Sequence, residues 1–446
     1  MRFSLANMKP KDKETKNTVN KGQEVEDLVE KICTKMFFSD FTIRSKKFKN
    51  ASGQEKEAGD ILVLFDDTLL VVQVKTKIDV KPFSEKTETD LSRINNKIDD
   101  AIGQFKTIKR AIANFRFNEV ETTKGYKIPF DRTKLKKVIG IVVFDLIGEE
   151  QINSDERTAI INGFEIRYEI PIHIFKRSDF EIISSELDTM PDFMDYIETR
   201  YLLYSKRMFI EPPFELNLLA LYKTKPEDVH LAIKENALVI VNDEYWEWYQ
   251  NECKELIQQR NLNNRPSYLI DDAISWLHSG VGFDPSEFGI TYPFPNDKEK
   301  EQGTVPNYLA VATELAKTSR LTRRKLGEKL LECLERATRN GLAYSVIIEK
   351  KNNSGIILLS SSKSRTVRSK ILYRVAAMAY CLYNLEKIVG FATEPLNIAL
   401  RSYDALFLSG VEFDNRAEIL EDAKTAFGAT SEAKFYEFFN SPASTQ

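Results

Sequence analysis

The stretch EKEAGDILVLFDDTLLVVQVKTK, residues 55–77, decides the fold of this chain. It contains two apolar runs, residues 61–65 and 69–75, joined by the polar segment Asp66-Asp67-Thr68. Short polar joints of this kind connect the strands of a β-hairpin, and aspartate suits the tight turn. The stretch therefore predicts an antiparallel hairpin.

Polar residues gather at the open end of this hairpin. Asp60 precedes the first strand, and Gln73 and Lys75 lie two residues apart on the second. Because side chains alternate along a strand, Gln73 and Lys75 share one face, whereas Val72 and Val74 point to the opposite, packed face. The spacing predicts a polar cluster at one end of a sheet.

This cluster suits phosphodiester hydrolysis. The Asp60 carboxylate, the Gln73 side-chain oxygen and the Val74 backbone oxygen are hard ligands of the kind that Mg²⁺ or Mn²⁺ prefers. Lys75 would orient the nucleophile or stabilise the transition state. A structural ion pair of Asp60 with Lys75 stays open as an alternative, as does a role for Gln73 as a polar residue of an edge strand.

The flanking segments predict the rest of the fold. Apolar residues recur at helical spacing over residues 22–38 and 89–115, and strands are expected at 41–45, 137–146 and from 170. The last strand is expected to turn into a helix that continues through DFMDYIETRYLLY, residues 192–204. The order helix, strand, hairpin, helix, strand predicts an α/β fold with one mixed sheet flanked by helices.

With these elements in place, the order of Asp60 and Gln73-x-Lys75 resembles the PD-(D/E)XK nuclease superfamily, and the glutamine is similar to its Mrr-like restriction endonuclease branch. The resemblance covers about residues 21–205 and implies a restriction-endonuclease-like mixed sheet. It differs from most of the superfamily at Gln73, which stands where a second acidic ligand is usual.

The resemblance also implies two further site residues. Gly22-Gln23-Glu24-Val25-Glu26 is similar to the Gly-x-x-apolar-Glu helix of that branch and places Glu26 at the acidic position, with Glu24 as a reserve. Gln104 in Ala101-Ile102-Gly103-Gln104 resembles a glutamine that faces the site. From the residues alone, Glu26 could equally be a solvated helix residue.

Composition divides the chain into four parts. Residues 1–20 are polar and basic and predict a flexible tail, residues 21–210 the nuclease-like domain, and residues 211–300 a mainly helical region. Residues 301–446 predict a C-terminal α+β domain with a basic patch, after the Pro-, Gly- and charge-rich stretch 291–306.

Charge is uneven along the chain. The whole chain has 64 Lys and Arg against 67 Asp and Glu, but residues 317–374 have 15 against 4, a net charge of +11. Basic residues near helix starts are suited to phosphate contact, although a solvated face and a protein partner are the alternatives. The candidates are Arg320, Arg323, Arg324, Lys325, Lys363, Arg365 and Arg368.

Several classes of protein are disfavoured. Four scattered cysteines without a CxxC pair, far in sequence from the three histidines, argue against a zinc finger or a disulfide framework. No GxxxxGK[ST] motif is present, which disfavours an intrinsic NTPase. The sequence has neither a signal-peptide core nor an apolar run long enough to span a membrane, which predicts a cytoplasmic protein.

Together these patterns and the resemblance predict a metal-dependent endonuclease acting on double-stranded DNA, in bacterial defence against foreign DNA. A homo-oligomer or a partner defence protein is compatible with this hypothesis. The alternative is a catalytically inactive DNA-binding or assembly subunit whose nuclease site has decayed.

Overall fold

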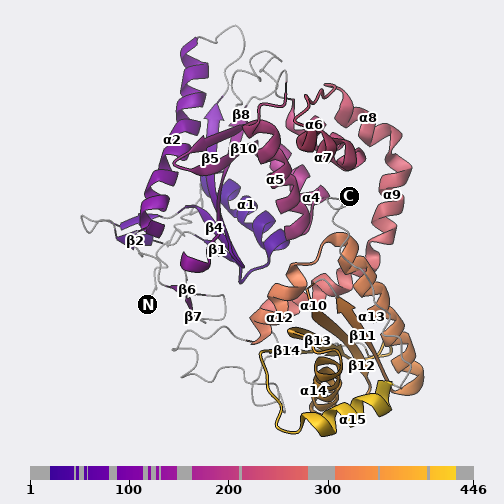
Figure 1. Cartoon of the computed structure of the whole chain (residues 1–446). Helices are drawn as coiled ribbons and strands as arrows, with labels where there is room; N and C mark the ends of the chain where they lie inside the picture. The colour runs from indigo at the N-terminus through magenta and orange to yellow at the C-terminus, as the bar shows by residue number, and fades with distance from the viewer. Residues whose placement is uncertain are drawn as a thin grey trace, which may run out of the picture.

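The computed structural model describes residues 21–44, 47–49, 55–57, 59–79, 88–113, 119–121, 127–129, 132–147, 163–209, 213–279, 307–349, 352–398 and 402–427. Within these ranges the chain is an α/β protein with a six-stranded mixed sheet, a mainly helical middle and a four-stranded C-terminal sheet (Figure 1). The fold class predicted from the sequence is confirmed. The predicted tail, residues 1–20, lies outside the described residues.

The decisive stretch forms the predicted hairpin, in which β4 (Ile61–Phe65) pairs antiparallel with β5 (Thr68–Asp79). Asp66 in its turn has a φ of +53°, a left-handed conformation that aspartate tolerates. β5 pairs in parallel with β8 (Lys137–Ile147), which pairs in parallel with β10 (Ile170–Lys176). The strand order is β1-β4-β5-β8-β10-β9, with β1 (Thr42–Arg44) and β9 (Phe164–Arg167) at the edges.

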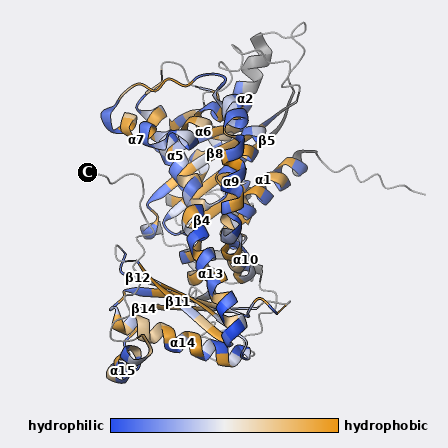
Figure 2. Ribbon diagram, turned by 90° about the vertical axis from the view of Figure 1, so that its right-hand side faces the viewer, coloured by the Kyte–Doolittle hydropathy of each residue, from blue (hydrophilic) through white to orange (hydrophobic). Residues whose placement is uncertain are grey.

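Helices cover both faces of this sheet, because its strands are apolar on both sides. One face packs against α1 (Lys21–Phe37), α4 (Arg177–Glu186) and α5 (Met190–Ser205), and the other against α2 (Glu88–Ala113). Along α1, α2 and the other helices, hydrophobic and hydrophilic residues interchange, as expected where one side packs inward (Figure 2).

The prediction of one helix continuing from β10 is wrong, because this segment forms two helices. α4 ends at Glu186, and α5 begins at Met190 after Thr189, whose hydroxyl accepts from the Asp192 backbone N–H. Pro191 lies in the first turn of α5, where it is tolerated but cannot continue a preceding helix. The break positions Asp188 for the contact with Arg320 described below.

The middle of the chain is helical. Its elements are α6 (Glu215–Thr224), α7 (Pro226–Glu235), α8 (Tyr245–Glu252), α9 (Lys254–Asn263), the short η4 (Arg265–Ser267) and α10 (Tyr268–Ser279). α8 and α9 run down one side of the molecule, from the level of the first sheet toward the second (Figure 1).

The C-terminal sheet has the order β11-β12-β13-β14, with helices on both faces. Its strands are β11 (Leu342–Glu349), β12 (Ser354–Ser361), β13 (Lys387–Thr393) and β14 (Tyr403–Ser409); its helices are α12 (Asn307–Ala316), α13 (Arg320–Asn340), α14 (Arg365–Leu382) and α15 (Arg416–Phe427). The small elements elsewhere are β2 (Lys47–Lys49) with β3 (Glu55–Glu57), β6 (Glu119–Glu121) with β7 (Lys127–Pro129), and η2 (Arg132–Lys134).

The two sheets share one apolar core. A single cluster of buried side chains extends from Val29 on α1 and Val72 on β5, through Ile274 on α10, to Phe391 on β13. α13 comes so close to η4 that a Cβ on Gly327 would lie 1.9 Å from the Pro266 carbonyl oxygen. Among the described residues, no helix is both long and apolar enough to cross a membrane.

Candidate functional site

Asp60 is fixed at the open end of the β4–β5 hairpin by the backbone of β5. Its N–H donates to the Val72 carbonyl over 3.1 Å, and its carboxylate oxygen Oδ2 accepts from the Val74 N–H over 2.6 Å. A carboxylate that accepts a backbone N–H is oriented without the cost of ordering a second side chain. Asp60 and Val74 are therefore adjacent in the structure, and their role as metal ligands stays a prediction.

Gln73 lies in an interior strand and is 1% exposed, so its interpretation as an edge-strand residue is wrong. Its side-chain oxygen Oε1 is buried and has no hydrogen-bond partner among the described residues. The Gln73 Nε2 atom is 3.5 Å from where a Cβ on Gly59 would stand. Leaving a buried acceptor unpaired costs about 1–3 kcal/mol, so this oxygen is suited to a ligand that the protein does not itself supply.

Lys75 follows Gln73 on the same face of β5. Val71 packs with α2, whereas Val72 and Val74 pack on the α1 side, so alternation directs Gln73 and Lys75 toward the α2 face. Lys75 is half-buried, and none of the ion pairs among the described residues includes it. The proposed ion pair with Asp60 is therefore absent from the described contacts, and the ammonium is available to a phosphate.

Glu26 and Gln104 do not join this group as expected. Glu26 is half-buried on α1, which packs on the face opposite to the Gln73 side chain. Gln104 is exposed, whereas Ala101, Ile102 and Phe105 are the residues of α2 that pack against the sheet. Gln104 is thus on the solvent side of α2, and its contact with DNA stays a prediction.

The residues at the hairpin end fit a hard divalent cation in part. The fixed Asp60 carboxylate and the orphaned Gln73 oxygen are both donors of the type that Mg²⁺ accepts. Within the described ranges, no group of three or more His, Cys, Asp or Glu side chains is arranged to hold a metal. Any cation here would thus rely on the amide oxygen, on backbone oxygens and on the substrate phosphate as well as on Asp60.

Sequence reasoning missed residues on the two neighbouring strands. Lys75 is in register with Phe144 of β8, which is in register with Lys176 of β10, so these three residues lie in one row across three parallel strands. Asp145 comes directly after Phe144 and pairs with Arg177 over 2.7 Å. The sequence carried a signal for Asp145, because a carboxylate near the carboxyl end of a buried apolar strand lies toward the end of the sheet where α/β sites form.

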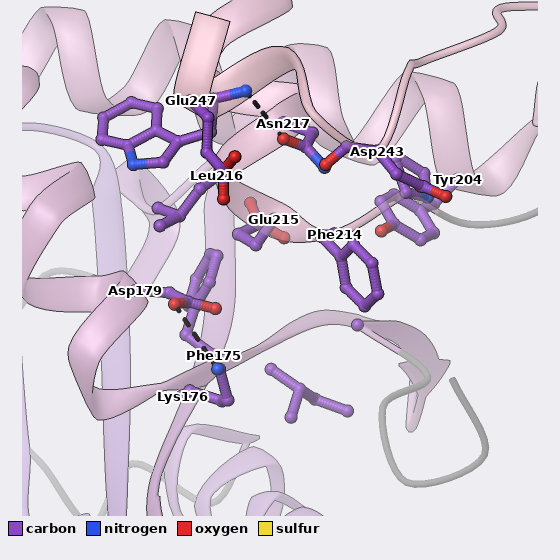
Figure 3. A pocket seen from close by; sticks show the side chains of 14 residues that line it. Phe175, Lys176, Asp179, Tyr204, Phe214, Glu215, Leu216, Asn217, Asp243 and Glu247 are labelled. Carbon is purple, nitrogen blue, oxygen red and sulfur yellow. Dashed lines mark hydrogen bonds and ion pairs between the residues drawn. The ribbon is translucent and has the colours of Figure 1, made fainter. Parts of the chain in front are cut away.

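A cavity of about 210 Å³ opens at the end of β10, between α4, α6 and α8. Figure 3 shows Lys176, Asp179, Glu215 and Glu247 around it, with Trp246 among its lining residues. At the usual strand spacing of about 4.8 Å, Lys176 lies on the order of 10 Å from Lys75 across β8. The cavity and the hairpin end therefore lie on the same side of the molecule, toward the carboxyl ends of β5, β8 and β10.

A buried ion pair lies beside this cavity, because one of its partners, Glu215, lines it. Arg200 is fully buried, and its Nε and Nη2 donate to the Glu215 carboxylate over 2.8–3.0 Å. Burial alone would lower the pKa of Arg200, but Glu215 more than offsets this and raises it. Burial raises the pKa of Tyr204 to about 12. Arg200 lies over the rings of Phe175 and Tyr204, which makes this ion pair part of a structural unit.

Two of the predicted DNA-binding arginines on α13 are internal. Arg320 pairs with Asp188 over 2.9 Å and with Asp271 over 2.5 Å. Arg323 is 1% exposed and pairs with Asp271 over 2.7 Å, and burial lowers its pKa. These arginines join α13 to the α4–α5 junction and to α10, so assigning them to DNA is wrong.

The arginines at the start of α14 are internal too. Arg365 pairs with Asp404 over 2.9 Å, and the fully buried Arg368 pairs with Asp404 over 2.5 Å and with Glu394 over 2.6 Å. Ser402 accepts a further bond from Arg368 over 2.7 Å. The Arg368 charge is neutralised inside the protein, so assigning it to DNA is wrong, whereas the DNA contact of the partly exposed Arg365 stays a prediction.

The rest of the basic patch is still a candidate for DNA contact. Lys363 is exposed at the start of α14, and Arg324 and Lys325 are half-buried on α13. Contact of these three residues with DNA stays a prediction. The net charge of residues 317–374 therefore overstates the positive charge available to a partner.

The fold and the sheet-end site define a mixed α/β protein with polar groups at the strand ends. The small subunit of the heterodimeric restriction endonuclease R.BspD6I is a solved structure similar to this chain, with 13% identity and a TM-score of 0.24. The match covers 49% of this chain and 92% of that chain. No family model and no curated protein matches the chain. Because the TM-score is low, this match carries no argument for the function.

Proposed function

We propose that this chain is a metal-dependent endonuclease of the PD-(D/E)XK type that hydrolyses phosphodiester bonds in double-stranded DNA. One observation carries the proposal. The Asp60 carboxylate, held by the backbone of β5, lies at the same end of the hairpin as Gln73, whose buried side-chain oxygen has no partner among the described residues, and Lys75 follows two residues later. A carboxylate and a neutral oxygen can bind a divalent cation, and a lysine beside them can stabilise the charge that develops during phosphodiester hydrolysis.

The proposed roles follow from the donor types. Asp60, Gln73 and the Val74 carbonyl oxygen would hold Mg²⁺ or Mn²⁺. The cation, when bound, supplies positive charge to the scissile phosphate and activates water. Lys75 holds the nucleophile or the phosphate in line by donating hydrogen bonds from its ammonium group.

The biological setting is proposed from the resemblance of the hairpin and its flanking helices to restriction endonucleases. It is defence against foreign DNA in a bacterial cytoplasm, by a homo-oligomer or with a partner defence protein. Apolar side chains exposed in the helical region support a partner. They include Leu238, Ile240 and Leu256, which are 62%, 78% and 71% exposed.

A second candidate function is a catalytically inactive DNA-binding or assembly subunit. The observation that favours it is Gln73 itself, because a neutral amide stands where most of the resembling superfamily has a carboxylate. The lower charge would weaken metal binding.

A plasmid cleavage assay separates the two functions. The purified chain is incubated with supercoiled plasmid and Mg²⁺, Mn²⁺ or a chelator, and nicked and linear products are quantified. The proposal expects products with either metal and none with the chelator. Binding of plasmid without metal-dependent cleavage, in both metals, would select the inactive subunit.

A further inference from the structure

An extended segment, residues 237–241, links α7 to α8 at the upper right of Figure 1. Its sequence is Ala-Leu-Val-Ile-Val. The central Val239 is buried, and its N–H donates to the Met208 carbonyl over 2.7 Å. Its neighbours Leu238 and Ile240 are mostly exposed. Because side chains alternate along an extended chain, the segment packs on one face and presents two large apolar side chains on the other.

One edge of the backbone of this segment is open. Val239 uses the other edge in a parallel bridge with Phe209, and successive residues of an extended chain direct their N–H and C=O groups to opposite edges. The backbone groups of Leu238 and Ile240 therefore point away from Phe209, and neither residue makes a backbone hydrogen bond with any residue that the structure describes. Exposed edges are usually protected by charged residues or proline, and residues 237–241 contain neither. The segment can therefore accept a further strand.

A hollow of about 430 Å³ adjoins the end of the segment. Its lining residues are Asn242, Glu244, Tyr245, Glu247, Trp248 and Asn251. The rings of Tyr245 and Trp248 stack at 5.0 Å, and the Tyr245 and Thr224 hydroxyls share a hydrogen bond of 2.9 Å. Glu244 and Glu247 are exposed, and none of the ion pairs among the described residues includes them. Two carboxylates beside a tryptophan ring suit a guanidinium, which pairs with carboxylates and stacks on aromatic faces.

The charge of the surrounding region selects among partners. Residues 227–255 contain 8 Asp and Glu against 2 Lys and Arg, a net charge of −6. This surface repels DNA phosphates, and a second copy of the chain would bring the same negative charge against it. The exposed Lys206 and Arg207 precede Met208 and so adjoin the start of the segment, whereas the acidic hollow adjoins its end. Charge complementarity therefore favours a protein segment that carries arginine at the end beside the hollow.

We propose that this face docks an extended segment of a partner protein, which adds a strand along residues 237–241 and places an arginine side chain in the hollow with Glu244 and Glu247. Strand addition gains affinity from backbone hydrogen bonds and specificity from side-chain contacts. The inference rests on the proposed function in one respect, because it names the kind of partner invoked there. Its test measures binding and not cleavage, so a failure of the nuclease proposal and a failure of this one are distinguishable.

Fluorescence anisotropy of labelled synthetic peptides, capped at both ends, tests the proposal with the full chain. The probes are Arg-Thr-Val-Thr-Val-Thr and Thr-Val-Thr-Val-Thr-Arg, because a strand can add in either direction. One control peptide has glutamate in place of arginine. Another carries an N-methyl group on every valine and threonine, which removes the backbone donors. The proposal expects saturable binding of an arginine peptide and about tenfold weaker binding, or weaker still, of both controls.

A change at one position tests the open edge. Ile240→Pro removes the N–H that a partner strand would use and should weaken the arginine peptide about tenfold. Ile240→Thr keeps the N–H and is the matched control, so it should weaken the peptide less. Leu238→Pro and Leu238→Thr make the same comparison should Ile240→Pro not fold, which circular dichroism checks. Equal affinities of a folded proline variant and wild type would place the peptide elsewhere and overturn the proposal.

A pair of changes tests the hollow. Glu244→Gln combined with Glu247→Gln should weaken the arginine peptide about tenfold and abolish its advantage over the glutamate peptide. Glu227→Gln combined with Asp228→Asn, on α7, is the control with the same change in net charge. An equal loss of affinity in the two double variants would mean that net charge alone attracts the peptide, which contradicts a site in the hollow.

Three further outcomes would overturn the proposal. The first is no binding of either arginine peptide up to its solubility limit. The second is equal binding of the arginine peptide and either control peptide. The third is sedimentation of the chain as a dimer that Ile240→Pro converts to a monomer, because a second copy would then occupy the edge.

Discussion

The end of the β4–β5 hairpin and the starts of α13 and α14 look alike in sequence and differ in structure. Both concentrate polar and charged residues beside apolar runs. At the hairpin end, Gln73 and Lys75 are left without protein partners among the described residues. At the helix starts, Arg323 and Arg368 are buried and bonded to aspartates.

The difference shows how a functional group is told from a structural one. A buried polar group that the protein satisfies is part of its stability, whereas one that it leaves unsatisfied is suited to a ligand. Counting charge along the chain cannot make this distinction. The following predictions test it, from the largest expected effect to the smallest.

Arg368→Ala should have the largest effect, and it should be on stability. It leaves Asp404 buried without its main partner, which costs about 3–5 kcal/mol in a buried pair. Urea unfolding measures the loss. Lys363→Ala, in the exposed turn just before the same helix, is the matched control and should stay within about 0.5 kcal/mol of wild type. Equal losses of stability in the two variants would contradict the structural role of Arg368.

Asp60→Ala and Lys75→Ala should leave the fold intact and reduce plasmid cleavage about 10²- to 10³-fold or more, as expected for loss of a preorganised charge. Asp67→Ala, in the turn at the far end of the same hairpin, should cut like wild type. Circular dichroism checks the fold of each variant. If the Asp60 and Lys75 variants cleave normally, the hairpin end is not the active site.

Gln73 variants should move metal affinity in opposite directions. Gln73→Glu adds a charge beside the proposed cation and should tighten manganese binding about tenfold, or ~1.4 kcal/mol, whereas Gln73→Ala should weaken it. Because Gln73 is 1% exposed, the new carboxylate should also lower the melting temperature until manganese is added. Calorimetry and thermal melts measure both. Identical manganese binding by all three proteins would favour the inactive subunit.

Arg324→Ala and Lys363→Ala should each weaken DNA binding at all sequences alike. Each phosphate contact removed should reduce the slope of log affinity against log salt by ~0.9. Lys234→Ala on α7 serves as a control with the same change in net charge. Unchanged salt slopes for both variants would show that Arg324 and Lys363 do not contact DNA phosphates.

The smallest expected effect is a loss of stability at acidic pH. Burial alone would raise the pKa of Glu394, but hydrogen bonds from Arg368 and Ser402 lower it further than burial raises it. The stability from this ionised group is complete above the unfolded pKa of about 4.3 and is lost as the pH falls through the lower folded pKa. Because Glu394 is partly exposed, about 1 kcal/mol or less is expected. Urea unfolding of Glu394→Gln should show a shallower loss of stability below about pH 4.5; an unchanged acid profile would contradict this.

Much of the fold could be predicted because its causes are local. The hairpin, the buried strand β8 and the long helix α2 follow from apolar spacing and turn residues. The break between α4 and α5 was missed, although Pro191 and the capping Thr189 are both visible in the sequence. The candidate site was predicted in part, because strand alternation gives the face of Gln73 and Lys75, whereas Gln104 was placed by resemblance and not by helical spacing.

The sequence by itself determined which residues are apolar, where the strands turn and which polar side chains share a strand face, because these depend on neighbours in the chain. Only the tertiary structure decided which charges are neutralised. Asp271 and Asp404 lie 52 and 36 residues from Arg323 and Arg368, so no local pattern could pair them.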